Sequence, residues 1–296
     1  MNKDIFQGWE AVRASDITRE QMDRDFRRVM SKAESLQAPR KFFRSQAGAR
    51  YIFAAALAVL LLVGATAVFR FASVRPQQVI VAENIEYTAP KGEIREIVLP
   101  DQSKVTLNSG SVLICPSEFG ETRSVYLLGE AIFDVTASDS QPFMVSTSDL
   151  RLRVHGTRFN VRAYLDDPDV RTTLCRGAVE VWPADRSDRR IELEPGQTLT
   201  YDKSGGSMIV TRSNTSEATS WESGELYFRS ESIHGVVRIL ERQFNVNVYL
   251  TTDKYNDAVI TASFIHGESL EDLLKAITAV IPGMKYSIND NKVYLK

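Results

Sequence analysis

The amino-acid sequence predicts a single-pass membrane protein. It places a short helical segment before the membrane, an all-β domain (sandwich or solenoid-like) after it, and a small C-terminal α+β domain of order β-α-β-β-α-β. Three observations predict this fold class. Residues 51–69 are nineteen consecutive uncharged residues. Residues 89–205 contain short strand patterns with no convincing helix between them, and two helical patterns flanked by strands follow residue 224.

Residues 51–69 have the length and composition of a transmembrane helix. At about 1.5 Å per residue they span roughly 28 Å, close to the thickness of a hydrocarbon core. Ten of the nineteen residues are Leu, Ile, Val or Phe, and no polar face interrupts them. A signal peptide is the alternative, because Ala65-Thr66-Ala67 resembles a cleavage site, but the 50 preceding residues are too many for an n-region.

The flanking charges predict the orientation of this helix. Four basic residues precede it closely and two follow it: Arg40, Lys41, Arg44 and Arg50, then Arg70 and Arg75. The positive-inside rule therefore places the N-terminus in the cytoplasm and the long C-terminal part outside. Residues 1–50 carry a net charge of +4 and residues 71–296 one of −7, so no strongly basic surface for nucleic acid is expected outside.

Residues 1–45 form a segment that is too small for an enzyme and is predicted to be helical. Thr18 and Gln21 have the spacing of a capping box between two amphipathic stripes. The positions that we expect to contact a partner lie on these stripes: Ile5, Phe6, Trp9, Val12, Phe26, Val29 and Met30. Two such short helices cannot bury each other well enough to be stable alone, which favours folding onto a partner protein. A hairpin lying on the membrane surface is the alternative.

A tether over residues 70–88 leads to the β domain over residues 89–205. Its strand patterns recur every eight to twelve residues, with turn sequences at Pro100-Asp101 and Asn108-Ser109-Gly110. This spacing is typical of a sandwich, a barrel or a solenoid. A linker over residues 206–223 then precedes the C-terminal domain over residues 224–296, in which Ser232 and Ser269 are predicted to cap two helices.

The residues do not favour catalysis. The three histidines, His155, His234 and His266, each stand alone, and neither a phosphate-binding loop nor a G-x-S-x-G motif is present. The acidic pair Asp166-Asp167 lies in a predicted turn, where solvated charge is the default. We therefore expect no enzyme activity, no cofactor and no metal site. A membrane-bound hydrolase with an inconspicuous site stays open as a hypothesis.

Six ordered motifs carry a family resemblance: LPDQSKVTLNSGSVL, VYLLGEAIFDV, PFMVST, VHGTRFNVRAY, TTLCRGAVEV and LEPGQTLTY. They resemble the periplasmic domain of FecR-type anti-sigma factors. Residues 224–296 resemble the C-terminal domain of FecR-like proteins of Bacteroidetes, itself similar to the secretin and TonB short N-terminal domain. Cys115 and Cys175 depart from the family pattern, which usually has an aromatic and an aliphatic residue there.

The resemblance implies an inner-membrane protein that is a regulator of an extracytoplasmic-function (ECF) sigma factor. The implied sigma-binding segment is residues 1–45, and the implied signal comes from the signalling domain of a TonB-dependent outer-membrane transporter. Intramembrane and periplasmic proteases would release the sigma factor, and no direct contact with nucleic acid is implied. An alternative function is that of an envelope module that binds glycan or protein, with the N-terminus as a mere anchor.

Two further features of the sequence carry chemistry. The Thr157 hydroxyl could attack the Gly156 carbonyl in an N-to-O acyl shift, and similar regulators are thought to cleave themselves at such a pair; the alternative is a β-bulge at Gly156. Cys115 and Cys175 are predicted to lie outside, where they could form a disulfide or pack as small apolar side chains.

Overall fold

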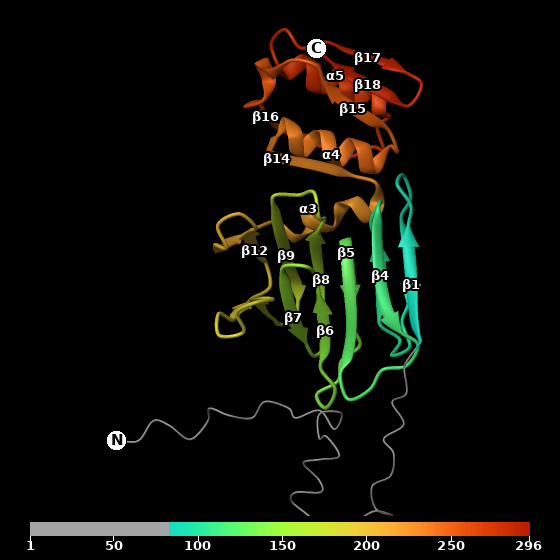
Figure 1. The fold of residues 1–296 in the computed structure, drawn as a ribbon, viewed down its shortest axis with the longest axis vertical. Helices are drawn as coiled ribbons and strands as arrows, with labels where there is room; N and C mark the ends of the chain where they lie inside the picture. The colour runs from blue at the N-terminus through green and yellow to red at the C-terminus, as the bar shows by residue number, and fades with distance from the viewer. Residues whose placement is uncertain (1–82) are drawn as a thin grey trace, which may run out of the picture. The chain divides into compact units, whose positions relative to one another are not determined.

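The computed structural model describes residues 83–296 (Figure 1). These residues form a β domain followed by a small α+β domain. Among them, none of the helices has the length and apolar character that crossing a bilayer requires. The predicted transmembrane helix, residues 51–69, and the predicted helical segment, residues 1–45, lie outside the described residues.

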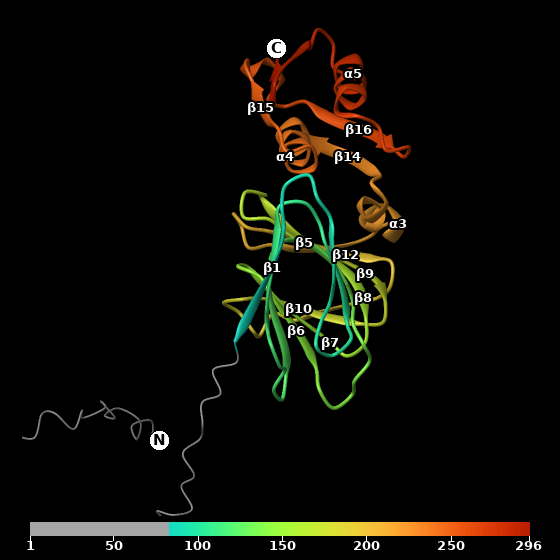
Figure 2. The same ribbon diagram turned by 90° about the vertical axis from the view of Figure 1, so that its right-hand side faces the viewer.

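Thirteen strands form one hydrogen-bonded network that folds into two facing sheets (Figure 2). The first sheet contains, in spatial order, β1 (Asn84–Ala89), β4 (Ser111–Pro116), β5 (Arg123–Asp134), β6 (Phe143–Ser146), β7 (Leu150–Val154), β10 (Val179–Pro183) and β11 (Ile191–Leu193). The second contains β2 (Arg95–Val98), β3 (Lys104–Leu107), β5 again, β8 (Arg158–Ala163), β9 (Asp169–Arg176), β12 (Gln197–Asp202) and β13 (Met208–Arg212). All pairs are antiparallel except β5 with β6. The β domain is therefore a sandwich, one of the predicted alternatives.

Strand β5 belongs to both sheets because it bends at Gly129. Its first residues pair with β4 and β6, and from Gly129 onward it pairs with β8 and β3. Gly129 has a φ of +105°, and a Cβ there would come within 2.7 Å of the Cα of Ser111. Both the conformation and the close approach require glycine.

The alternation of apolar residues along the strands places one core between the two sheets. At its centre the ring of Phe133 stacks on that of Phe159, with centroids 5.1 Å apart. Phe133 also meets Phe143 of the opposite sheet edge-on at 6.2 Å. These three side chains are fully buried, so the core ties the two sheets together.

The C-terminal domain has the predicted β-α-β-β-α-β order, with a 3-10 helix after its second strand and one further strand at its end. Its elements are β14 (Leu226–Ser232), α4 (Ile233–Gln243), β15 (Asn247–Leu250), the 3-10 helix η2 (Asp253–Tyr255), β16 (Val259–Phe264), α5 (Leu270–Val280), β17 (Tyr286–Asn289) and β18 (Lys292–Leu295). β14 pairs with β16, and β15, β18 and β17 form a second sheet. Both predicted caps are confirmed: Ser232 accepts from the Gly235 amide, and Ser269 forms a capping box with Asp272.

Two segments that the sequence suggested were irregular contain regular structure. β1 begins at Asn84, inside the predicted tether, and β13 lies inside the predicted linker. The rest of that linker forms α3 (Thr215–Thr219) and the 3-10 helix η1 (Ser220–Ser223), which lie between the two domains in Figures 1 and 2. Both strands are mostly exposed, so they lack the alternation of apolar residues that reveals a strand.

Candidate functional site

A buried carboxylate joins the two domains. Asp167 lies in the turn between β8 and β9, and its side chain is 0% exposed. It accepts hydrogen bonds from Arg162 of β8 (Nε, 2.8 Å) and from two arginines of α4, Arg238 (Nε, 3.0 Å) and Arg242 (Nη2, 2.6 Å). We call these four residues the arginine clasp. Because Arg238 and Arg242 are one helical turn apart, α4 presents both to the same carboxylate.

The charges of the clasp determine its protonation. Burial by itself would raise the pKa of Asp167, but the guanidinium groups of Arg162 and Arg242 lower it well below its ordinary value. Burial would likewise lower the pKa of Arg162, and Asp167 raises it above the usual range. Asp167 and Arg162 are therefore both charged at neutral pH.

Arg242 is the most constrained member of the clasp. Its guanidinium carbon lies 3.6 Å from the centroid of the Tyr164 ring, and Nη2 also donates to the exposed carboxylate of Asp166 at 2.7 Å. Its main-chain carbonyl accepts from the Ser109 hydroxyl at 2.5 Å and from the Gly92 amide at 2.8 Å. One helical residue thus touches three separate loops of the β domain.

Two further charged contacts join the sandwich to the segments that follow it. Glu222 of η1 accepts from Thr106 Oγ1 at 3.0 Å and from Arg158 Nη2 at 2.9 Å. Arg171 of β9 lies 3.6 Å from Glu231 of β14. We call the set of contacts between the sandwich and the segment from residue 215 onward the junction.

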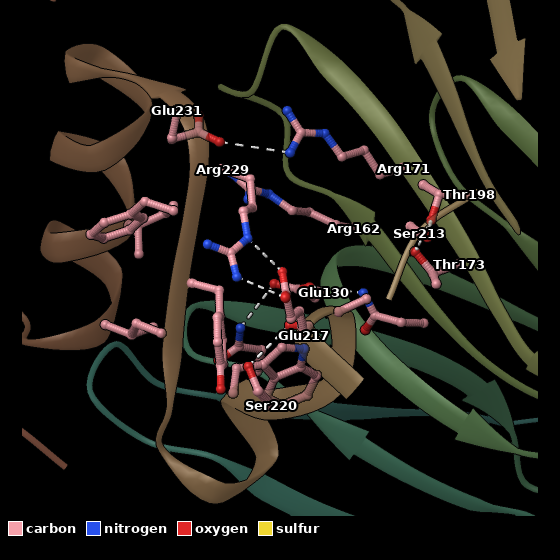
Figure 3. Close-up of a pocket in the computed structure, with 18 of the residues that line it drawn as sticks. Glu130, Arg162, Arg171, Thr173, Thr198, Ser213, Glu217, Ser220, Arg229 and Glu231 are labelled. Atoms are coloured by element: carbon pink, nitrogen blue, oxygen red, sulfur yellow. Dashed lines mark hydrogen bonds and ion pairs between the residues drawn. The ribbon is translucent and has the colours of Figure 1, made fainter. Parts of the chain in front are cut away.

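A cavity of about 450 Å³ lies at the junction, beside the arginine clasp (Figure 3). Strands β8, β9 and β12 supply one wall, and α3, η1, β14 and α4 supply the other. The charged residues of its lining are four arginines and four glutamates: Arg162, Arg171, Arg229, Arg242, Glu130, Glu217, Glu225 and Glu231. The volume is within the range of small-molecule sites, about 300–1,000 Å³.

Polar side chains on adjacent strands form the floor of this cavity. Glu130 of β5 is buried and accepts from the amide groups of Asn108 and Asn160, each at 2.9 Å. Beside it, the hydroxyl groups of Thr173 and Thr198 are 2.8 Å apart, and Thr198 is also bonded to Ser213. Figure 3 shows this row of three hydroxyl side chains; Thr173 and Thr198 lie on the neighbouring strands β9 and β12, and Ser213 directly follows β13.

The residues that the sequence predicts to bind a sigma factor are not part of the described structure. Ile5, Phe6, Trp9, Val12, Phe26, Val29 and Met30 lie outside the described residues, so sigma-factor binding by them stays a prediction.

The sequence left a disulfide between Cys115 and Cys175 open as one of two alternatives, and both cysteines are free thiols in the structure. Cys115 is buried among apolar side chains of the sandwich core, and Cys175 is half-buried on β9. Burial, together with the charge of Asp101, raises the pKa of Cys115 to about 11. The structure therefore corresponds to the second alternative, packing as small apolar groups, at Cys115.

Gly156 and Thr157 lie in the turn before β8. The Thr157 hydroxyl is buried and donates to the Ala178 carbonyl at 2.9 Å. A Cβ at Gly156 would come within 2.7 Å of the Cα of Ala137, so this glycine permits two segments to approach closely. Self-cleavage at this bond, which the sequence left open beside a β-bulge, stays an untested hypothesis.

The arginine clasp was not predicted from the sequence. The interpretation of Asp166-Asp167 as a solvated pair is correct for Asp166, whose side chain is 64% exposed, and wrong for Asp167. A signal was available: Arg238 and Arg242 flank the apolar stripe of a predicted helix at a spacing of four residues. Their partner, 75 residues earlier in the chain, was not identifiable from local patterns.

Comparisons with known proteins place this architecture in a family. The family model described as "FecR protein" matches residues 85–180, and that described as "FecR, C-terminal" matches residues 225–295. Two crystal structures of a "putative anti-sigma factor" from Parabacteroides distasonis ATCC 8503, at 1.65 Å and 2.50 Å resolution, are similar. Each is 30% identical, covers 72% of this chain and 98% of its own, and has a TM-score of 0.67 or 0.68. A comparison with curated proteins gave no significant match.

The fold and the matches define a regulatory protein of the anti-sigma class. The two family models together cover more than half of the chain, and the solved relative is 30% identical over nearly its whole length. The chain belongs to the FecR family and is a FecR-type anti-sigma factor.

Proposed function

We propose that this anti-sigma factor relays a signal across the inner membrane, from a TonB-dependent outer-membrane transporter to an ECF sigma factor. Residues 1–45 hold the sigma factor in the cytoplasm, residues 51–69 cross the membrane once, and residues 83–296 receive the signal in the periplasm. The uncharged nineteen-residue stretch, the basic residues before it and the family membership support this topology.

The arginine clasp is the observation that carries the proposal. A buried carboxylate shared by three guanidinium groups holds α4 against the β8–β9 turn. A partner that binds the C-terminal domain therefore acts on the sandwich as well, and the sandwich is the part nearer in sequence to the membrane segment. Such a connection is what a receptor needs to convert docking at one end into a change at the other.

The C-terminal domain offers a means of docking to the transporter domain. Its two-stranded sheet, β14 with β16, has unpaired edges within the described chain, and Val259 of β16 and Ile265 just after it are exposed. A partner strand can add to such an edge through main-chain hydrogen bonds, which need no particular side-chain motif.

Regulated proteolysis is the proposed output. A single membrane helix can tilt or slide, but full switching of a cytoplasmic equilibrium requires about 5.5 kcal/mol of differential binding. Cleavage of the chain by periplasmic and intramembrane proteases removes this requirement because it releases the cytoplasmic segment irreversibly.

Co-purification of the full-length chain with its sigma factor tests the proposal. We expect the wild-type chain to retain a sigma factor, Trp9→Ala to lose it, and Trp9→Phe to retain most of it because the aromatic contact remains. Retention of the sigma factor by a chain that lacks residues 1–45 would contradict the assignment of this segment.

A second measurement tests the signal from outside. Asp167→Asn should retain the sigma factor but respond less to the inducing transporter, as measured by a sigma-dependent reporter gene. An unchanged response would show that signal relay does not need the clasp. The assignment of sigma-factor binding to residues 1–45 would not be affected.

A further inference from the structure

We propose that the cavity at the junction binds a neutral polyhydroxylated small molecule of the size of a mono- or disaccharide. This inference goes beyond the proposed relay and is independent of whether the sigma-factor or transporter assignments hold. It is carried by the charge balance of the cavity, by two buried polar atoms that have no partner in the described part of the chain, and by the row of hydroxyl groups in its floor.

The charges of the lining argue against an ionic ligand. The four arginines and four glutamates give no net formal charge. Each arginine already has a carboxylate: Arg229 donates two hydrogen bonds to Glu217, Arg171 bonds to Asp169, and the other two belong to the clasp. An anion would have to displace one of these carboxylates and would meet the buried Glu130, and a cation would have to compete with an arginine for its partner.

Two lining residues have buried polar atoms that lack a partner within residues 83–296. They are the Asn160 carbonyl oxygen and the Trp221 indole nitrogen, on side chains that are 4% and 5% exposed. Asn160 comes from the sandwich and Trp221 from η1, so they belong to opposite sides of the junction. Buried polar groups normally have partners, so unpartnered atoms on residues that line a cavity are candidate contacts for an occupant of that cavity.

The chemistry of these two atoms identifies the complementary group. The indole nitrogen only donates and the amide oxygen only accepts, whereas a hydroxyl group can do both. A carboxylate cannot donate to Asn160, and an ammonium group cannot accept from Trp221. Hydroxyl groups are the neutral partners that suit both sides.

The floor of the cavity fits the same ligand. The Glu130 carboxylate accepts hydrogen bonds only, and the hydroxyl groups of Thr173, Thr198 and Ser213 can donate or accept. Tyr227 and Trp221 add aromatic surface to the other wall. Sugars combine hydroxyl groups with apolar C–H faces, so their recognition uses fixed polar side chains together with aromatic rings.

Because both domains contribute walls, an occupant binds the joined form and stabilises it. The midpoint of thermal unfolding should therefore rise with ligand concentration, as for any ligand that binds only the folded state.

The test uses the full-length chain in a detergent without a sugar head group, such as lauryldimethylamine oxide. Thermal unfolding and titration calorimetry are measured with glucose, galactose, mannose, xylose, N-acetylglucosamine, maltose and cellobiose. The matched anions glucuronate and galacturonate are measured beside them. We expect a saturable shift with at least one neutral sugar and a weaker one, or none, with its matched anion.

Three variants locate the site. Trp221→Phe removes the indole donor and keeps a smaller aromatic ring, and Thr173→Val removes a hydroxyl from the cavity floor; we expect each to weaken binding about tenfold. Thr172→Val is the matched control, because it is the same change one residue away, on the core-facing side of β9, and its hydroxyl is buried without a partner in the described chain. This control should bind like the wild type.

Four results would overturn the proposal. They are the absence of a saturable shift with every neutral sugar, tighter binding of glucuronate than of glucose, equal weakening by Thr172→Val and Thr173→Val, and unchanged binding in both cavity variants. None of these depends on retention of the sigma factor, so failure here is distinguishable from failure of the proposed relay.

Discussion

The carboxylate of Asp167 accepts a hydrogen bond of 2.6 Å from Arg242, and this pair connects two domains through residues 75 positions apart in the chain. The carboxylate is fully buried and Arg242 nearly so. Each of these two buried charges is compensated by the other, because an unpaired buried charge is costly. The folded arrangement of the sandwich against the C-terminal domain therefore depends on this contact.

Removal of the Asp167 charge should weaken the junction. Asp167→Asn keeps the size of the side chain but leaves three guanidinium groups without their shared carboxylate, and we expect a loss of about 3 kcal/mol in the free energy of unfolding. Urea unfolding followed by tryptophan fluorescence measures it. Asp166→Asn is the matched control, because its carboxylate is mostly exposed, and it should cost no more than about 1 kcal/mol. Equal effects of the two variants would contradict a special role for Asp167.

The contribution of Asp167 should depend on pH in acid only. The pKa of this carboxyl group is lower in the folded protein than its ordinary value of 3.8. Its stabilisation is therefore fully present above the unfolded-state pKa and is lost as the pH falls through the folded-state pKa. The difference in stability between the wild type and Asp167→Asn should be constant from pH 8 to about pH 5 and shrink below about pH 4. A difference that shrinks near neutral pH would point to another titrating group.

Replacement of Gly129 by alanine should destabilise the protein more than the same replacement at Gly196. An alanine at position 129 would have to adopt a disfavoured positive φ, and its Cβ would collide with Ser111 where β5 passes from one sheet to the other. We therefore expect Gly129→Ala to lower the free energy of unfolding by at least about 2 kcal/mol. Gly196→Ala is the control: its φ is +85°, but nothing lies within 4 Å of the added Cβ. Gly196→Ala should lower the free energy of unfolding by about 1 kcal/mol. Equal unfolding midpoints for both would show that the close approach does not matter.

The two cysteines should react as thiols of different accessibility. Thiol counting on the unfolded, non-reduced chain should give two free thiols. In the folded protein Cys115 should resist iodoacetamide, because it is buried and its pKa is raised to about 11, so little thiolate forms. Cys175 should be modified faster, and peptide mass spectrometry distinguishes the two. A count of zero thiols would mean that a disulfide forms after all.

The bond between Gly156 and Thr157 should remain largely intact in the described conformation. The Thr157 hydroxyl donates to the Ala178 carbonyl, which is too weak a base to remove its proton. We therefore expect one full-length band on a denaturing gel after membrane extraction. Two fragments from the wild type, with a single band from Thr157→Val, would instead support self-cleavage. Thr157→Val is suitable because it keeps the shape of the side chain and removes only the nucleophile.

The features predicted correctly from sequence are local ones. Ser232 and Ser269 lie just before apolar stripes, and a cap is a hydrogen bond to an amide three residues ahead. Inward and outward positions of a half-buried strand alternate with a period of two, which reveals the strands of the sandwich. β1 and β13 escaped prediction because exposed edge strands lack that alternation.

The sequence by itself determined the uncharged stretch of residues 51–69, the order of the helices and strands in the C-terminal domain and the resemblance to the FecR family, because each is encoded in residues close together in the chain. Only the tertiary structure decided that Asp167 is buried while its neighbour Asp166 is exposed, and that Asn160 and Trp221 line one cavity. Burial and partnership depend on which distant segments pack together. Residues dozens of positions apart leave no periodic trace in a single sequence.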